Sequence, residues 1–170
     1  MTNQGARLGF IGLGIMGKPM AGHLLDAGNE VFLHTLGSVP QELIAKGGKA
    51  CASAKEVTQN ADLIFIMVPD TPDVQLVLFG EMGVASGLAK GKTVVDMSSI
   101  APIETKRFAE RINALGCDYL DAPVSGGEVG AKAATLTIMV GGTQAAFDRV
   151  KPHFERMGKN ITLVGGNGDG

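Results

Sequence analysis

Three glycines near the amino terminus have the spacing of a loop that binds a phosphate. Gly12, Gly14 and Gly17 form the pattern Gly-x-Gly-x-x-Gly. They follow a short apolar run over Leu8–Ile11 and precede a helical pattern over Met16–Ala27. In such a loop the first glycine allows a tight turn, the second lets a pyrophosphate approach the backbone, and the third lets the helix pack closely. The helix N-terminus favours an anion because its N–H groups are unpaired and the helix dipole is positive there. We therefore predict a dinucleotide site. Its loop residues are Gly12, Leu13, Gly14, Ile15, Met16 and Gly17.

Thr35 follows the second predicted strand, at the point where a dinucleotide fold often carries a charge. An acid there binds the ribose hydroxyls of NAD, and an arginine accommodates the 2′-phosphate of NADP. Thr35 and the residues after it are neutral. The sequence therefore favours NAD, with NADP left possible, and a hydroxyl contact from Thr35 to the ribose. The alternative is that Thr35 only shapes the turn.

Two further predicted strands end in residues that can line the same site. Met67, Val68 and Pro69 end the most apolar strand, where we expect them to wall the adenosine and its ribose. Pro69 is equally explained as a strand terminator. Ser98 and Ser99 follow the next strand, and we assign Ser98 to the nicotinamide side. The alternative for Ser99 is an N-cap of the following helix.

A glycine-rich segment after a later strand can bind a carboxylate. Ser125, Gly126 and Gly127 stand in the run Asp121–Gly127. Backbone amides freed of side chains, together with a hydroxyl, make a small anion-binding nest. We assign these three residues to a small carboxylate substrate, and the alternative is an ordinary Ser-Gly-Gly turn.

The composition excludes several kinds of partner. The chain has 170 residues, of which 45% are hydrophobic, enough for one domain with a buried core. Its 15 basic and 17 acidic residues are nearly balanced, which argues against nucleic acid and anionic membranes. The polar segment 1–7 has no signal-peptide core, and no apolar run reaches membrane-spanning length. We expect a cytoplasmic protein.

The cysteines and histidines give no sign of a metal site. Cys51 and Cys117 are far apart and form no Cys-x-x-Cys pair, so we expect free thiols. His23, His34 and His153 are dispersed and lack the spacing of metal ligands.

Apolar runs alternate with helical patterns along the chain, which predicts an α/β fold with a doubly wound, mostly parallel Rossmann-type sheet and helices on both faces. The predicted strands are Leu8–Ile11, Glu30–His34, Asp62–Val68, Thr93–Asp96, Cys117–Leu120, Thr135–Val140 and Ile161–Val164. The predicted helices are Met16–Ala27, Val39–Lys46, Ala54–Asn60, Pro72–Leu78, Ala101–Leu115 and Gln144–Met157. We expect Ser53, with Glu56, and Thr71 to cap two of them. Residues 1–165 then form the dinucleotide-binding domain, and residues 165–170 read as a loose, glycine-rich end.

These motifs occur together in one family. The segment Gly9–Ala21 resembles the N-terminal signature of the β-hydroxyacid dehydrogenases, Asp96–Ile100 resembles their cofactor-side loop, and Asp121–Gly127 resembles their substrate segment. The resemblance continues through Ile64–Pro72 and Lys159–Gly170, so it covers the whole chain in order.

The resemblance implies an oxidoreductase that transfers hydride between a nicotinamide cofactor and a small aldehyde acid or its β-hydroxy acid. It implies that Ser125, Gly126 and Gly127 hold the carboxylate. It also implies a general-acid lysine shortly after Gly170, at the start of a helix leading into an all-helical domain that makes the dimer. That lysine and that domain are absent from these 170 residues, so residues 166–170 are expected to begin the connection to it. No catalytic residue is assigned within the chain.

Two alternatives stay open on the sequence. One is a related dehydrogenase of the same family with a different hydroxy acid. The other is a non-enzymatic dinucleotide-binding or interaction module that reuses the fold.

Overall fold

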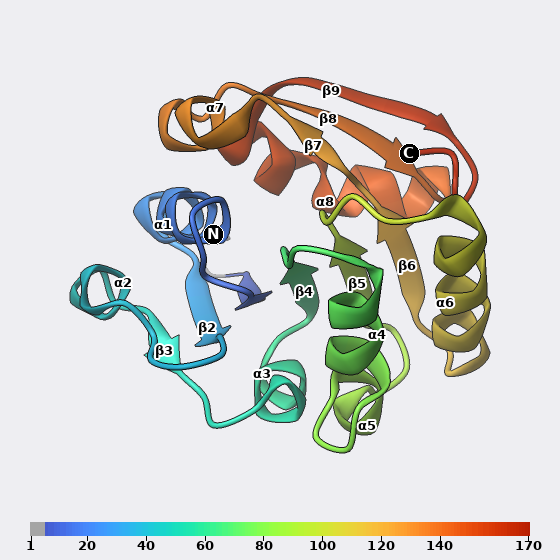
Figure 1. Cartoon of the computed structure of the whole chain (residues 1–170), viewed down its shortest axis with the longest axis horizontal. Coiled ribbons are helices and arrows are strands. Elements are labelled where there is room, and N and C mark those ends of the chain that lie inside the picture. Colours follow the sequence, from blue (N-terminus) through green and yellow to red (C-terminus); the bar gives the residue numbers. More distant parts are fainter. Residues whose placement is uncertain (1–5) are drawn as a thin grey trace.

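A parallel sheet lies at the centre of the computed structural model, which describes residues 6–170 (Figure 1). The expectation about the polar amino terminus falls mainly on residues 1–5, outside the described residues. The strands are β1 Arg7–Ile11, β2 Glu30–His34, β3 Lys49–Ala50, β4 Leu63–Ile66, β5 Thr93–Asp96, β6 Asp118–Asp121, β7 Val124–Ser125, β8 Leu136–Gly141 and β9 Gly158–Gly165. The sheet runs in the order β3-β2-β1-β4-β5-β6-β8-β7, with β9 paired to β8.

The strand order creates a switch point between β1 and β4. The chain first winds outward from β1 through β2 to β3, and then returns to add β4, β5 and β6 on the other side of β1. All the pairings from β3 to β6 are parallel. This is the strand order of dinucleotide-binding folds, in which ligands bind outside the carboxyl ends of the strands beside the switch point. The predicted Rossmann-type α/β fold is confirmed.

The later part of the sheet departs from parallel pairing. β8 runs antiparallel to β6 and to β7, whereas β9 is parallel to β8. The strand predicted over Ile161–Val164 is longer in the structure, where β9 spans Gly158–Gly165. β3 and β7 were not predicted, because a two-residue strand is too short to show an alternating pattern.

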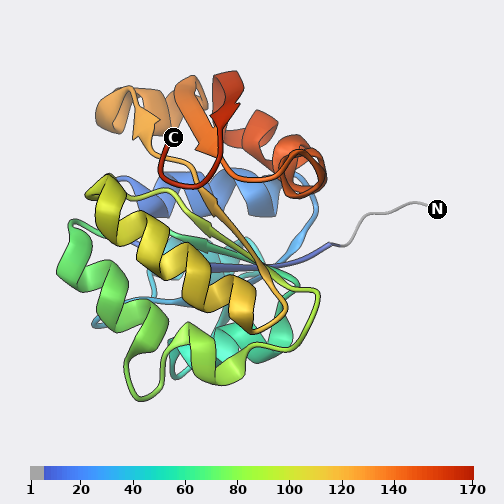
Figure 2. The ribbon, with the colours of Figure 1, turned by 90° about the vertical axis from the view of Figure 1, so that its right-hand side faces the viewer.

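The helices are α1 Gly17–Asp26, α2 Gln41–Ala45, α3 Ala54–Asn60, α4 Thr71–Phe79, α5 Val84–Gly87, α6 Pro102–Ala114, α7 Gly127–Ala133 and α8 Gln144–Met157. They lie on both faces of the sheet (Figure 2). α5 and α7 were missed, since both are short and contain glycine, the poorest helix former after proline. None of the helices within residues 6–170 is long and apolar enough to cross a membrane.

The caps predicted from the sequence are partly right. Ser53 caps α3 by accepting a hydrogen bond from Glu56 N at 3.1 Å. The expectation for Thr71 is wrong, because Asp70 is the N-cap of α4 and its carboxylate accepts from Thr71 N at 2.7 Å. The capping alternative for Ser99 is also wrong, since the N-cap of α6 is Ala101, which has no side-chain hydrogen bond.

Alternating side chains of the central strands feed two apolar cores. On β4, Phe65 belongs to the core under α1 and α8, whereas Ile64 and Ile66 belong to the core under α3, α4 and α6. These three side chains have no exposed surface. Burial on both faces is the reason that this strand reads as a continuous apolar run.

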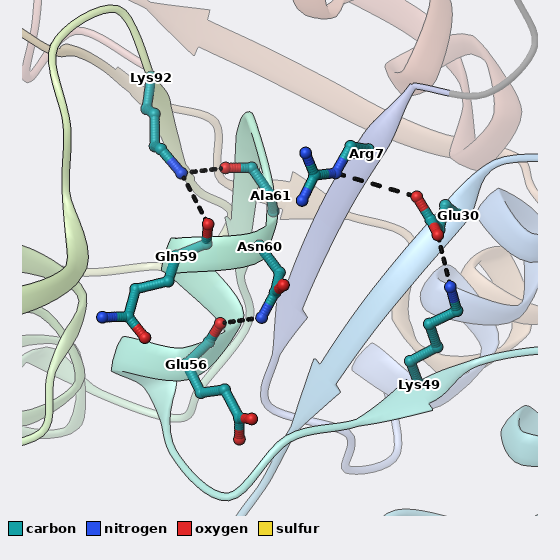
Figure 3. Close-up of polar contacts among 8 residues, drawn as sticks. All are labelled: Arg7, Glu30, Lys49, Glu56, Gln59, Asn60, Ala61 and Lys92. Atoms are coloured by element: carbon teal, nitrogen blue, oxygen red, sulfur yellow. Dashed lines mark hydrogen bonds and ion pairs between the residues drawn. The ribbon is translucent and has the colours of Figure 1, made fainter.

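The amino end of the sheet is joined by polar contacts (Figure 3). Glu30 lies between Arg7 and Lys49, which links β1, β2 and β3. Nearby, the ammonium group of Lys92 donates to carbonyl oxygens at the end of α3, including Ala61 O at 2.8 Å. Burial lowers the pKa of Lys92. These contacts join the amino-terminal ends of the strands, opposite the end at which the ligand site is predicted.

Candidate cofactor-binding site

A cleft of about 900 Å³ opens at the carboxyl ends of β1, β2, β4 and β5. It contains every residue that the sequence assigned to the cofactor except Ser98. Its lining also includes residues that the sequence did not assign to the cofactor, from the ends of β1, β2 and β5, the start of α3, α4 and the loop after α4. These are Ile11, His34, Leu36, Ala52, Ser53, Ala54, Asp73, Leu76, Val77, Gly80, Glu81, Met82, Gly83 and Ser99.

The three loop glycines have different local environments. Gly12 has a φ of +98°, and a Cβ there would lie 2.1 Å from Met67 O. A Cβ on Gly17 would lie 1.8 Å from Gly12 O, so α1 packs against the loop only because this side chain is absent. A Cβ on Gly14 would meet nothing within 4 Å. The loop therefore needs Gly12 and Gly17 for its own fold, and leaves the backbone of Gly14 open to the cleft.

The first turn of α1 begins at the last glycine of this loop, Gly17. The N-cap residue, Met16, makes no side-chain capping bond, and no acidic residue lies in the first turn. α1 spans 10 residues, so its dipole is well developed. No side chain satisfies the N–H groups at this end, but Lys18 N donates to Gly14 O at 3.0 Å and Pro19 has no N–H. The loop residues before Lys18 therefore offer the N–H groups that can bind a phosphate.

Thr35 holds the glycine loop in place. Its Oγ1 accepts a hydrogen bond from Leu13 N at 3.1 Å, which joins the end of β2 to the loop after β1. This bond gives Thr35 the role of shaping the turn. Because the Thr35 oxygen is the acceptor in it, the hydroxyl hydrogen can still be donated to another group. Beside it, His34 Nδ1 lies 3.1 Å from Cys51 O. Leu36 is 90% exposed at the rim of the cleft.

The charge of the cleft lining is acidic. Asp73 and Glu81 belong to it, and no lysine or arginine does. Asp73 is committed to the capping box of α4, where it accepts from Asp70 N at 3.1 Å. A ligand group with two negative charges would find no cationic side chain among the lining residues.

The two serines after β5 have different surroundings. Ser98 is 3% exposed, and its Oγ accepts from Val68 N at 2.9 Å. This bond ties the end of β5 to the wall of the cleft after β4. Ser99 is exposed and lines the cleft itself. The sequence assigned Ser98 to the nicotinamide side, but in the structure Ser99 lines the cleft, because the Ser98 hydroxyl faces inward and is bonded to Val68 N.

A buried carboxylate lies directly below this turn. Asp96, the last residue of β5, is 1% exposed. Its Oδ1 accepts from Ser98 N at 3.0 Å, and its Oδ2 accepts from the Tyr119 hydroxyl at 3.2 Å. Burial raises the pKa of Asp96 to about 6, although these hydrogen bonds oppose the rise. Burial and the nearby Asp96 charge also raise the pKa of Tyr119.

The predicted substrate segment lies beyond the β5 end of the cleft. Ala122 N donates to Asp96 O at 2.7 Å, so the chain leaves β6 immediately beside β5. Ser125, Gly126 and Gly127 are exposed and do not line the cleft. Gly126 and Gly127 have φ values of +136° and +60°, which favour glycine.

The expectation of a loose end over residues 165–170 is wrong. Gly142 N donates to Gly165 O at 2.9 Å, and Gly170 N donates to Asp121 Oδ2 at 2.9 Å. The glycine-rich composition suggested mobility. These glycines instead allow the backbone to pack closely against the end of β6. Both cysteines are free, as expected, and residues 6–170 contain no group of three or more potential metal-ligating side chains.

This fold and this cleft define a dinucleotide-binding domain. A family model described as the NAD binding domain of 6-phosphogluconate dehydrogenase matches residues 7–166. The chain is an NAD-binding domain, and it belongs to the β-hydroxyacid dehydrogenase family.

Among curated relatives, the 2-hydroxy-3-oxopropionate reductase of Escherichia coli is 63% identical over 164 residues, which are 96% of this chain and 56% of the relative. Among solved structures, the 3-hydroxyisobutyrate dehydrogenase of Mycobacterium tuberculosis with L-serine has a TM-score of 0.90 and 31% identity, over 99% of this chain and 57% of that one. Psf3 in complex with NADP+ and 2-OPP has a TM-score of 0.87 and 31% identity, over 95% of this chain and 57% of that one. The chain therefore spans a little over half the length of these relatives.

Proposed function

We propose that this chain is the cofactor-binding part of a reductase that transfers hydride between NADH and 2-hydroxy-3-oxopropionate (tartronate semialdehyde), with glycerate as the reduced product. The observation that carries the proposal is the 63% identity to the E. coli reductase of that name, together with a cleft built for a dinucleotide. Use of NADPH remains the second possibility for the cofactor.

The order of residues along the sheet edge supports an orientation for the cofactor. Thr35 lies at one end of the cleft, the glycine loop in the middle and Ser99 at the other end. In this fold the pyrophosphate lies on the helix N-terminus, with the adenosine toward β2. The nicotinamide is thereby directed toward Ser99 and the end of β5. NADH, when bound, supplies the hydride.

The segment after β6 is placed to receive the substrate. Ala122 N is bonded to Asp96 O, so Ser125, Gly126 and Gly127 follow the strand next to the proposed nicotinamide end. Their exposed backbone and the Ser125 hydroxyl suit a carboxylate. In this arrangement the chain binds and orients the aldehyde acid, and the carbonyl carbon accepts the hydride.

Reduction of the carbonyl also needs a proton at its oxygen. The family resemblance puts the donating lysine after Gly170, in a helical domain that also forms a homo-oligomer. Residues 166–170 would lead into it. We therefore expect residues 1–170 alone to bind cofactor but to be inactive, since a positioned general acid contributes roughly 10²- to 10⁴-fold.

The first test is a fluorescence titration of the 170-residue chain with NADH and NADPH. We expect saturable binding of NADH below about 1 mM, within the ordinary range for such sites. No response to either cofactor up to that concentration would sink the proposal. The Gly14→Ala variant, whose added Cβ would meet nothing within 4 Å, is the control for signal that does not come from the cleft.

The second test is turnover by a chimera that joins residues 1–170 to the remaining part of the E. coli reductase. We expect it to reduce 2-hydroxy-3-oxopropionate with NADH. Ser125→Ala should lower its kcat/KM about 10- to 100-fold, as expected for a lost hydrogen bond to a carboxylate. A chimera that binds NADH but does not turn over the substrate would favour a non-enzymatic binding module, and turnover that Ser125→Ala does not affect would remove Ser125 from the substrate contact. Oxidation of 3-hydroxyisobutyrate is measured in parallel, since a dehydrogenase of that name shares the fold at TM-score 0.90; a higher kcat/KM for it would replace the proposed substrate.

A further inference from the structure

Asp121 binds a segment of the chain that lies far away in the sequence. Its Oδ1 accepts from Gly168 N at 3.0 Å and from the side-chain amide of Asn167 at 3.2 Å. Its Oδ2 accepts from Gly170 N at 2.9 Å. Both oxygens of the carboxylate are therefore used to hold residues 167–170.

Asn167 adds contacts to the strands on either side of Asp121. Its side-chain amide also donates to Tyr119 O at 2.7 Å and lies 3.3 Å from Gly141 O. The segment thus spans the ends of β6 and β8. It is closed on itself as well, because Gly166 N donates to Asp169 Oδ2 at 3.0 Å and Asp169 N donates to Gly166 O at 3.1 Å.

The segment approaches the sheet as closely as the backbone permits. A Cβ on Gly141 would lie 2.4 Å from Gly166 O, 2.7 Å from Asp121 Oδ2 and 2.9 Å from Gly170 N. A Cβ on Gly170 would lie 2.5 Å from Asp121 O. A side chain at Gly141 or Gly170 would disrupt this contact, so the position of the segment is set by the close approach of the backbone as well as by the carboxylate.

The choice of a carboxylate at this position needs a reason, because Asp121 is only 6% exposed. Burying a charge is costly unless hydrogen bonds compensate it. The N–H groups of Gly168 and Gly170 and the amide of Asn167 supply that compensation, and an apolar residue would leave them unsatisfied. Charge-assisted bonds are also short and directional, so they fix the orientation of the segment as well as its presence.

Asp121 is also the first residue of the proposed substrate segment. β6 ends at Asp121, and Ser125 follows four positions later in the printed sequence. We propose that Asp121 is a positioning residue, which fixes residues 167–170 against the end of β6 and so sets where the chain after Gly170 meets the substrate. The inference rests on the proposed function, in which the proton donor belongs to that following part. Asp121 acts through the segment that it holds and does not touch the reacting atoms.

The first test measures amide hydrogen exchange of residues 167–170 in the 170-residue chain. Asp121→Asn keeps the size of the side chain but turns an N–H group toward one of the donors, so we expect exchange to rise at least about tenfold. Asn167→Ala should raise it as well and serves as a second variant should Asp121→Asn fold poorly. Asp118→Asn makes the same change at the other end of β6, where the partner is Arg149, and should leave this exchange unchanged. Unchanged exchange in both Asp121→Asn and Asn167→Ala overturns the inference.

The second test measures steady-state kinetics in the chimera described above. Asp121→Asn should lower kcat at least about tenfold, while KM for NADH and for the aldehyde acid stays within about threefold, because only the proton donor is displaced. A merely structural role would instead lower the folded fraction and leave kcat per folded molecule intact. A kcat equal to that of Asp118→Asn overturns the inference. If the unsubstituted chimera has no reductase activity, the proposed function fails and the hydrogen-exchange result alone decides whether Asp121 holds the segment.

Discussion

The hydroxyl of Tyr119 donates a hydrogen bond to Asp96 Oδ2 at 3.2 Å, and both side chains are buried between β5, β6 and the helices that cover them. The pair lies directly beneath Ser98, whose backbone N–H binds the other oxygen of Asp96. A buried acid thus supports the turn that forms one end of the cofactor cleft. This arrangement has a consequence for stability that can be measured by changing the pH.

The stability of the domain should depend on the ionisation of Asp96. Burial raises its pKa from 3.8 to about 6, so the folded chain binds this proton more tightly than the unfolded chain does. The stabilising contribution of the proton is complete below about pH 4 and is lost as the pH rises through about 6. We expect Asp96 to reduce the free energy of unfolding by up to about 3 kcal/mol over that interval.

Urea unfolding of the wild type and Asp96→Asn between pH 4 and pH 7 isolates this effect from other acids, because only the difference between the two proteins is used. The stability of the wild type relative to the variant should fall as the pH rises. A difference that does not change with pH, or that rises, would contradict the assignment.

The two serines after β5 should respond differently to substitution. Ser98→Ala removes the acceptor of Val68 N, and leaving this partly buried N–H group unsatisfied should cost about 1 kcal/mol, at the low end of the range for such groups. Ser99→Ala changes an exposed hydroxyl and should alter the free energy of unfolding by less than about 0.5 kcal/mol. Thermal unfolding measures both. If Ser99 contacts the cofactor, its substitution should weaken NADH binding without this loss of stability, whereas equal destabilisation by both variants would contradict the geometry.

The glycine loop should separate a folding requirement from a binding requirement. Gly12→Ala places a Cβ 2.1 Å from Met67 O at a φ of +98°, so we expect a loss of more than about 2 kcal/mol in stability. Gly14→Ala meets nothing within 4 Å, so the fold should be unaffected. Its methyl group nevertheless points where the pyrophosphate is expected, and NADH affinity should fall at least about tenfold. Unfolding curves and NADH titrations of both variants check this, and full NADH affinity in Gly14→Ala would move the pyrophosphate elsewhere.

The cleft should discriminate against NADPH. Its charged lining residues are Asp73 and Glu81, and the residue beyond Thr35 is the neutral, exposed Leu36. A 2′-phosphate carries extra negative charge and finds no cation there, so NADPH should bind at least about tenfold more weakly than NADH. Leu36→Arg should tighten NADPH binding about tenfold through a charge-assisted bond, and Leu36→Gln, which is polar but uncharged, should not. Equal affinities in the unsubstituted chain would contradict this interpretation of the lining.

The sequence predicted the features that depend on neighbouring residues. The conformations of Gly12 and Gly17 are local requirements of a strand-loop-helix turn, so their spacing was sufficient to place them. The continuous apolar run of β4 reflects burial on both faces of the sheet. The cap at Ser53 is a hydrogen bond between two residues only three positions apart in the sequence. These signals were strong enough to predict a doubly wound, mostly parallel sheet and the end of the sheet at which the cleft lies.

The sequence could not predict features that depend on contacts between distant segments. Which of Ser98 and Ser99 faces the cleft is decided by the bond to Val68, 30 residues away. The ordered path of residues 167–170 is decided by Asp121, which is 46 to 49 residues away from the groups that it binds. By itself, the sequence therefore determined the class of fold and the position of the glycine loop at which we propose that a dinucleotide binds. Only the tertiary structure decided which side chains face the ligand and which hold other segments in place. The reason is that the sequence does not indicate the partner of a hydrogen-bonding group when that partner lies far away along the chain.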